Sequence, residues 1–445
     1  MQKSQLSVAL VVVLLALSFN VHAQQAPAYA LKNVVIHDGV TQAYNGHIVW
    51  RNGIIEAIGE SIEIPFDAHT TDGGDTLHVY SSIVDGAATW GSPDLPGRQE
   101  RPPRPGDPTY DRAGIQPDRV PSSHLKSEDK SFAAAYNAGI GVAALGFKGN
   151  MFPGSIDVFT IDDTQTKEYL FKSNIGQKYQ FTGASGVYPS TLMAMMAKTR
   201  QLFYDATALK SHQDLYNGNP TSYETPKRDL VLESLFPVLN KEKPLFAHID
   251  SRDDIQRLLK MQDELGFNIV LVSGKAAYTM AQELKNRQIS VLASIDISKK
   301  PEWMDKSEKS DSLKTDTLST DELAFREKQE SAWILERDNI KSLLDQGVLV
   351  GFASNGMDLK ELSEKMKYLT ESGLSESQLN AIFTVNSAKI LGIDRSFGRL
   401  SPGYVSNIRV YSKEFSNPDT KLLHVTNGGA LTEIKHETPS PRGRR

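Results

Sequence analysis

Three polar side chains that can do chemistry stand close together in the stretch FAHIDSRDDI, namely His248, Asp250 and Arg252. The apolar residues before them predict a short buried strand, so these side chains would follow its end. Lys148 has a similar place in LGFKGN, directly after another predicted strand. A lysine, an arginine and a histidine at one rim suit an anionic ligand. The competing interpretation places Lys148 and Arg252 on surface loops, where most charged side chains lie.

Metal chemistry is not expected from these residues. A catalytic zinc site takes about three protein ligands and a water molecule. The other histidines are scattered along the chain without ligand spacing, so His248 is at most a weak candidate ligand. The favoured interpretation is a hydrogen-bonded histidine at a strand end. Neither a phosphate-binding loop nor a Gly-x-Ser-x-Gly elbow occurs, and no cofactor is predicted.

The elements that must position these residues alternate between strand and helix through the middle of the chain. Buried strands are predicted for AGIGVAALGF, SIDVFTIDD, PLFAHID, NIVLVSG, ISVLASID and QGVLVGFASNG. Apolar-faced helices are predicted for YPSTLMAMMAKTRQLFYDATALK, SRDDIQRLLKMQDELGF and AAYTMAQELKNRQ. Such repeats favour a parallel sheet, either open or closed as a barrel. In a barrel, chemistry takes place where the strands end and the next loops begin.

Both ends of the chain are rich in predicted β-strands. Asp38-Gly39 and Asn52-Gly53 supply hairpin turns near the beginning, and SFGRLSPGYVSNIRVYSKE shows strand alternation near the end. Because chain termini often lie close together, the two β-rich ends can pair into one sheet. The proline- and arginine-rich stretch 92–121 is expected to lie over the mouth of the site or to be a solvated loop. The mixed-charge stretch 299–330 is expected to be a solvated loop that leads into a helix at SAWILERDNIKSLLDQ.

The amino-acid composition is that of an ordinary globular protein. With 39% hydrophobic residues and a formal net charge of -5, the chain is not expected to bind nucleic acid. An early lysine and an apolar run predict a signal peptide at residues 1–23, so we expect a periplasmic or secreted protein that does not span the membrane after cleavage. Cysteine is absent, which excludes disulfides and thiolate sites. The tail 437–445 is expected to be disordered.

Four stretches of the sequence resemble the amidohydrolase superfamily, nearest to its imidazolonepropionase-like and exported Xaa-Pro dipeptidase-like branch. The likeness as a whole covers about four fifths of the chain after residue 23, more than one short motif could. The stretches are LKNVVIHDGVTQAYNGHIVWRNGIIEAIGESIEIP, SSIVDGAATWG, KPLFAHIDSRDDIQRLLKMQDELGFNIVLVSGKAAYTMAQELKNRQISVL, and LVGFASNG with LSESQLNAIFTVNSAKILGIDRSFGRLSPGYVSNIRVY.

The resemblance implies an α/β fold in which a (β/α)8 TIM-type barrel at 80–397 carries a small composite β-sandwich built from 28–79 and 398–436. Members of the family bind one or two divalent metals through a His-x-His pair, two further histidines and an aspartate, sometimes with a bridging carboxylated lysine. The metal acidifies a bound water and polarises the carbonyl that the water attacks. The aspartate takes the proton from that water.

Most of these implied ligand positions carry other residues in this chain. The His-x-His positions fall on Ala87 and Thr89 in YSSIVDGAATWG. The later histidine falls on Ser273, with a one-residue slip to Gly274 left open, and the aspartate falls on Asn355. A neutral amide accepts hydrogen bonds but is no general base near neutral pH. Only the histidine of FAHIDSRDDI keeps an implied ligand position.

We therefore expect an exported pseudo-hydrolase that binds a small-molecule or peptide ligand, or a partner such as an active amidohydrolase homologue. The alternative is an active hydrolase that cleaves C–N bonds of cyclic amides or small peptides at an atypical site. A divalent metal such as zinc is expected only under that alternative. The candidate pocket at the barrel mouth comprises Ala87, Thr89, Lys148, His248, Arg252, Ser273 and Asn355.

Overall fold

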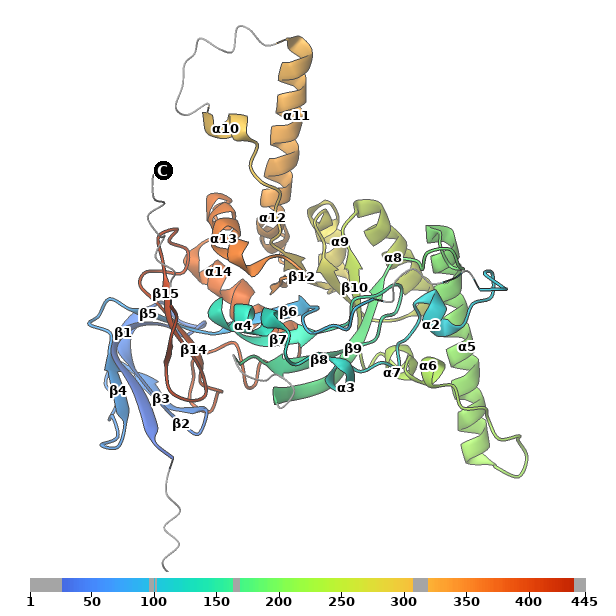
Figure 1. The fold of residues 1–445 in the computed structure, drawn as a ribbon, viewed down its shortest axis with the longest axis horizontal. Helices are drawn as coiled ribbons and strands as arrows, with labels where there is room; N and C mark the ends of the chain where they lie inside the picture. The colour runs from blue at the N-terminus through green and yellow to red at the C-terminus, as the bar shows by residue number, and fades with distance from the viewer. Residues whose placement is uncertain (1–25, 96–99, 101, 163–168, 307–318, 436–445) are drawn as a thin grey trace, which may run out of the picture.

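The computed structural model describes residues 26–95, 100, 102–162, 169–306 and 319–435. The expected signal peptide at 1–23 and the expected tail at 437–445 lie outside these described residues. The described chain forms two sheets with helices packed around one of them, so the predicted mixed α/β class is confirmed (Figure 1). Within the described ranges, no helix is long and apolar enough to cross a membrane.

The terminal sheet contains strands from both ends of the chain. Its strands are β1 (Ala28–His37), β2 (Tyr44–Arg51), β3 (Ile54–Gly59), β4 (His69–Asp72), β5 (His78–Ser81), β14 (Asn407–Tyr411), β15 (Leu422–Asn427) and β16 (Thr432–Glu433). The two chain ends meet where β14 pairs antiparallel with β5. The hairpin between β2 and β3 turns at Asn52 and Gly53, whose φ angles are 52° and 77°, as a type I′ turn requires. The division into domains at residues 80 and 397 stays a prediction.

The central sheet follows the chain in sequence order, from β6 to β13. Its strands are β6 (Ile83–Ala88), β7 (Ile140–Leu145), β8 (Ser155–Thr160), β9 (Leu170–Gln180), β10 (Leu245–Ile249), β11 (Ile269–Ser273), β12 (Ser290–Ser294) and β13 (Val350–Ala353). β6 and β7 are parallel, and β9 to β13 are parallel. β8 runs antiparallel to both of its neighbours, so the sheet is mixed and departs from eight regular β/α units.

The two end strands of the central sheet, β6 and β13, lie side by side. The Ser354 N–H donates to Asp85 Oδ1 at 2.9 Å, and the Asn355 N–H donates to the Ala87 carbonyl at 3.0 Å. The Asp85 side chain thus takes an N–H that a strand partner would otherwise bind. No ladder joins β13 to β6 among the described residues, so the structure shows a strongly curved sheet but no closed barrel.

Helices cover the outer face of the central sheet (Figure 1). The longer ones are α4 (Lys130–Asn137), α5 (Leu192–Gly218), α8 (Arg252–Leu265), α9 (Ala281–Asn286), α11 (Thr320–Arg337), α12 (Asn339–Asp345), α13 (Leu362–Glu371) and α14 (Glu376–Ala381). The shorter ones are α2 (Tyr110–Ala113), α3 (Pro121–His124), α6 (Leu230–Glu233), α7 (Phe236–Leu239), α10 (Glu302–Lys306) and α15 (Ser387–Ile390). A π-helical turn, η5 (Ile382–Asn386), joins α14 to α15, and 3-10 turns are η2 (Ala277–Met280) and η4 (Leu359–Glu361).

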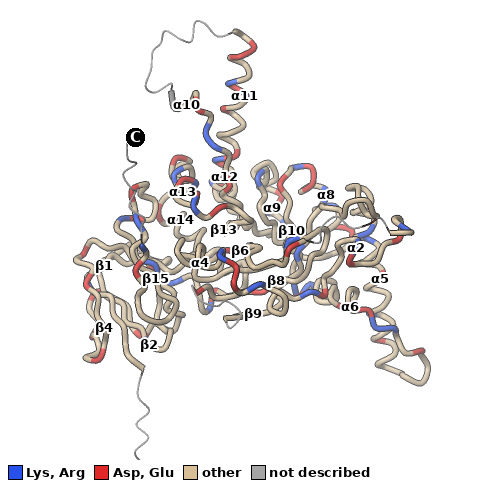
Figure 2. The backbone as a smooth tube through the Cα atoms, viewed as in Figure 1, with Lys and Arg blue, Asp and Glu red and all other residues tan. Residues whose placement is uncertain are grey.

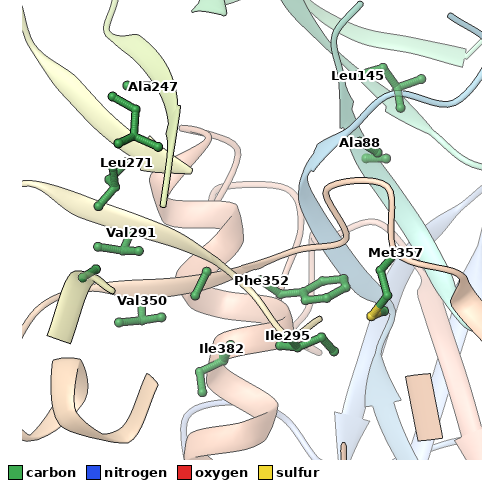
Figure 3. Packing of buried hydrophobic residues seen from close by; sticks show 14 of the residues in the cluster. Ala88, Leu145, Ala247, Leu271, Val291, Ile295, Val350, Phe352, Met357 and Ile382 are labelled. Atoms are coloured by element: carbon green, nitrogen blue, oxygen red, sulfur yellow. The ribbon is translucent and has the colours of Figure 1, made fainter. Parts of the chain in front are cut away.

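Alternate strand residues enter two separate apolar clusters. Ala247 and Leu271 belong to the cluster that packs against the helices (Figure 3), whereas Phe246 and Val270 belong to a second cluster. Because side chains alternate between the faces of a strand, His248 shares the face of Phe246. That face is the concave side of the curved sheet, where the strand ends can bring polar groups together.

Part of the stretch 299–330 is helical, contrary to the predicted loop. α11 begins at Thr320, and the Ser319 side chain accepts a hydrogen bond from the Glu322 N–H at its N-terminus. Asp321 and Glu322 in the first turn suit the positive end of the helix dipole. α11 extends away from the body of the protein and carries mixed charge (Figure 2).

Candidate functional site

Three of the predicted pocket residues are brought together at the ends of β6, β10 and β13. His248 Nδ1 and Asn355 Oδ1 are 3.0 Å apart, and the Asn355 N–H reaches the Ala87 carbonyl. Asn355 has a φ of 45°, a left-handed conformation that asparagine adopts more readily than most residues. This conformation directs its amide toward the imidazole.

The His248 ring is neutral. Burial, together with the nearby Lys178 ammonium, lowers the pKa of His248 well below its ordinary value, although the hydrogen bond with Asn355 opposes this shift. A neutral imidazole has a single N–H, and the acceptor oxygen of Asn355 places it on Nδ1. Nε2 therefore carries a lone pair and is an acceptor.

Lys178 on β9 is a site residue that the sequence analysis missed. Its ammonium is buried and donates to the Phe147 carbonyl at 3.0 Å. Burial lowers the pKa of Lys178 to about 8, and the charge of Lys148 adds to the effect. The signal that could have found it is a lysine in IGQKYQF, inside a stretch with strand alternation. A buried lysine with a lowered pKa is typical of functional sites.

The surroundings of Arg252, Ser273 and Thr89 differ from those of His248. Arg252 is exposed at the first turn of α8, which Ser251 caps. Ser273 ends β11 with a φ of 70°, and its buried hydroxyl has no hydrogen-bond partner within the described structure. Thr89 is half-buried, and its carbonyl accepts from the Ser92 N–H. The exposure of Arg252 agrees with the competing interpretation of a surface residue, and its grouping with Lys148 and His248 stays a prediction.

A large cavity lies over the ends of β6, β7 and β9. It has a volume of about 1290 Å³, and Lys148 is among the residues that line it. The proline- and arginine-rich loop supplies two further basic residues, Arg112 and Arg119. We call this the mouth cavity. Its wall carries both signs of charge, because it is also lined by the acidic side chains of Asp94, Glu100 and Asp111.

Arg119 is fixed in the wall of the mouth cavity. Its guanidinium lies 4.1 Å from the centroid of the Phe147 ring and donates to Gln116 Oε1 at 3.2 Å. Such stacking favours arginine over lysine. Burial lowers the pKa of Arg119, but an arginine stays charged near neutral pH. The mouth cavity therefore contains a preorganised cation.

The residues at the strand ends do not fit a divalent metal. Ala87 has no donor, and the Asn355 amide is already bound to His248. Within the described ranges, no group of three or more His, Cys, Asp or Glu side chains could hold a metal ion. A single imidazole nitrogen is too few for a catalytic site, which takes about three protein ligands.

Asp85 is the buried acid nearest to these strand ends. It is fully buried in β6, and its Oδ1 accepts hydrogen bonds from the Ala87 and Ser354 N–H groups. Burial raises the pKa of Asp85 to about 6, and these hydrogen bonds limit the rise. Its bonds show that this carboxylate holds β6 against the chain after β13.

Comparison with known proteins shows what this chain is similar to in sequence and in fold. The Amidohydrolase family model matches residues 303–432. No curated protein matches the chain in sequence. The solved structure of an amidohydrolase from Thermotoga maritima MSB8 is 21% identical, has a TM-score of 0.72, and is matched over 91% of this chain and 99% of its own.

Two further solved structures share the fold at lower similarity. A prolidase complexed with N-methylphosphonate-L-proline is 11% identical with a TM-score of 0.52, over 92% of this chain and 100% of its own. A Xaa-Pro dipeptidase with methionine bound in the active site is 13% identical with a TM-score of 0.50, over 91% of this chain and 100% of its own. The partial match to the family model and this shared fold make the chain similar to amidohydrolases.

Proposed function

We propose that this protein binds a small ligand on an amidohydrolase fold and has lost metal-dependent hydrolysis. The observation that carries the proposal is the hydrogen bond between His248 Nδ1 and Asn355 Oδ1, which are 3.0 Å apart and lie beside Ala87. Where a metal site needs several anionic or imidazole donors, this pair offers one neutral nitrogen and an amide. The strand ends therefore favour binding of polar organic groups over coordination of an ion.

The mouth cavity supports a zwitterionic ligand such as a short peptide. Arg112, Arg119 and Lys148 can receive a carboxylate, while Asp111 and Glu100 can receive an amine. The Xaa-Pro dipeptidase and the prolidase that share the fold hold methionine and a proline phosphonate. Dipeptides ending in proline or methionine are therefore suitable first probes.

Calorimetry combined with product analysis tests this proposal. Purified protein is titrated with the dipeptides, and the same mixtures are then assayed for free amino acids. Binding without release of amino acids supports the proposal. Arg119→Gln should weaken binding about tenfold, because a stacked, preorganised guanidinium is lost. Lys389→Gln, at an exposed lysine on α15, is the matched control. Turnover by the wild type would contradict the proposal.

A second candidate is an active hydrolase of C–N bonds with an atypical site. Its support is the neutral His248, whose Nε2 carries a lone pair, near Lys178 with its lowered pKa. A panel of imides, lactams and dipeptides tests this candidate. Turnover that His248→Ala abolishes and Lys389→Gln leaves intact would establish it.

Three further expectations are proposals of the same account. We infer that the curved central sheet is a variant of the TIM-type barrel, in which ligands bind at the ends of the strands. Export follows from the predicted signal at 1–23, and N-terminal sequencing of the mature protein tests it. Association with an active homologue is tested by co-purification from the native host.

A further inference from the structure

A second cavity lies between the central sheet's helices and the terminal sheet, away from the mouth cavity. It has a volume of about 590 Å³, within the range of about 300 to 1,000 Å³ typical of ligand sites. Its walls come from α4, from the segment 359–367 and from the chain between β14 and β15, which gather on one side of the protein (Figure 1). The proposed function does not use this junction cavity.

The junction cavity has an apolar wall. Leu362 and Met366 of α13 contribute to it, together with Phe415 and Leu422 from the chain that follows β14. All four side chains are themselves buried, and Phe415 packs against Tyr411 at 5.4 Å between ring centroids. This wall is therefore a preformed apolar surface against which an alkyl chain can leave water and pack.

Three lysines line the same cavity, and no aspartate or glutamate does. They are Lys360, Lys367 and Lys421, and all three are exposed. Within the described part of the chain, none of their ammonium groups forms an ion pair. The cavity thus combines an apolar wall with a positively charged lining.

Acidic residues close to these lysines in the chain are engaged elsewhere. Asp419 pairs with Lys413 at 3.5 Å, and Glu361 pairs with Lys365 at 3.1 Å. Glu364 accepts from the Tyr368 hydroxyl at 3.1 Å. The Asp358 carboxylate accepts the Lys360 backbone N–H at 3.0 Å and lies outside the cavity lining. The lining itself is therefore positively charged, and an anion from solution would complement it.

We propose that the junction cavity binds a medium-chain aliphatic carboxylate. The alkyl chain lies against Leu362, Met366 and Phe415, and the carboxylate lies among the three lysines. Both parts of the ligand are needed, because burial of the chain supplies the larger share of the binding free energy and the lysines select the charge. The bound carboxylate would contact both α13 and the chain between β14 and β15, and so would connect the terminal sheet to α13.

Isothermal titration of the full-length protein with octanoate tests this proposal. Octanol lacks the charge and butyrate lacks most of the chain, so each should bind at least about tenfold more weakly than octanoate. The double variant Lys367→Gln, Lys421→Gln should lose about tenfold in affinity for octanoate. Lys389→Gln, an exposed lysine outside the cavity, should bind like the wild type.

A blocking variant keeps the test independent of charge. Ala134 is an exposed residue of α4 that lines the cavity, so Ala134→Trp should fill the space without disturbing the core and should abolish binding. Circular dichroism and the melting temperature check that each variant is folded. The proposal is overturned if folded wild type does not bind octanoate, or if the lysine and Ala134 variants bind it as well as Lys389→Gln does.

Discussion

Asp85 shows how one buried side chain both holds two strands and makes stability depend on pH. Its Oδ1 accepts from the Ala87 and Ser354 N–H groups, and burial raises the pKa of the carboxyl from 3.8 to about 6. Between these pH values the folded state binds more protons than the unfolded state, so the contribution of Asp85 to stability falls as the pH rises.

Replacement of Asp85 separates these two roles. Asp85→Asn keeps an acceptor oxygen but does not titrate, so it should gain up to about 3 kcal/mol relative to wild type between pH 4 and pH 7. Asp85→Ala leaves two buried N–H groups without an acceptor and should cost about 2 to 4 kcal/mol. Urea unfolding across this pH range measures both effects. Parallel pH profiles for the wild type and Asp85→Asn would contradict the account.

Lys178 should give a pH effect of the opposite sign. Burial lowers its pKa from 10.5 to about 8, so between these values the unfolded state binds more protons. The stability of the wild type relative to Lys178→Met should therefore rise, by up to about 3 kcal/mol, as the pH increases from about 8 to about 10.5. Guanidinium unfolding at several pH values measures the difference. A constant difference would show that the Lys178 amine is well solvated.

Sequence reasoning found part of this site. The hydrogen-bonded, strand-end setting of His248 was predicted from the lack of partners for metal binding, and the structure pairs the residue with Asn355. Lys178 and Arg119 were missed, because nothing in a single sequence distinguishes a buried or stacked cation from a solvated one. Arg252 is exposed, as the competing interpretation of a surface residue expected.

At the scale of elements, Gly86 allows β6 to lie against β12 and β13. A Cβ at this position would contact Leu292 Cδ2 and approach the Phe352 carbonyl oxygen to 2.9 Å. Gly86→Ala should therefore destabilise the protein by about 1 to 3 kcal/mol through overpacking. Gly106→Ala, where no atom lies within 4 Å, is the matched control. Thermal unfolding compares the stability of the two variants. If both were equally stable, β6 could move away from β12 and β13 without loss of stability, which would contradict this prediction.

The sequence predicted the strands at 245–249, 269–273 and 290–294 because apolar runs bounded by turns are strong signals. The direction of β8 was not predictable, since buried parallel and antiparallel strands have the same apolar pattern. The part of α11 before residue 331 was mistaken for a loop because its residues are mostly charged, and a solvated helix has little apolar periodicity.

At the scale of the whole molecule, Glu376 connects α14 to the terminal sheet. It accepts from the Tyr80 hydroxyl at 2.5 Å and from the Phe415 and Ser416 N–H groups at 3.1 and 2.8 Å. Glu376→Ala leaves all three donors without this acceptor and should cost about 3 to 5 kcal/mol. Calorimetry should show one unfolding transition for the wild type. Two separate wild-type transitions would mean that the terminal sheet folds independently of the rest.

The central claim concerns the metal, and metal analysis tests it most directly. The protein is incubated with zinc or manganese, freed of unbound ions and analysed by mass spectrometry beside His248→Ala. The account predicts well below one equivalent of either metal in both proteins, since His248 has no second imidazole or carboxylate at the strand ends. Close to one equivalent in the wild type that is lost in His248→Ala would contradict it.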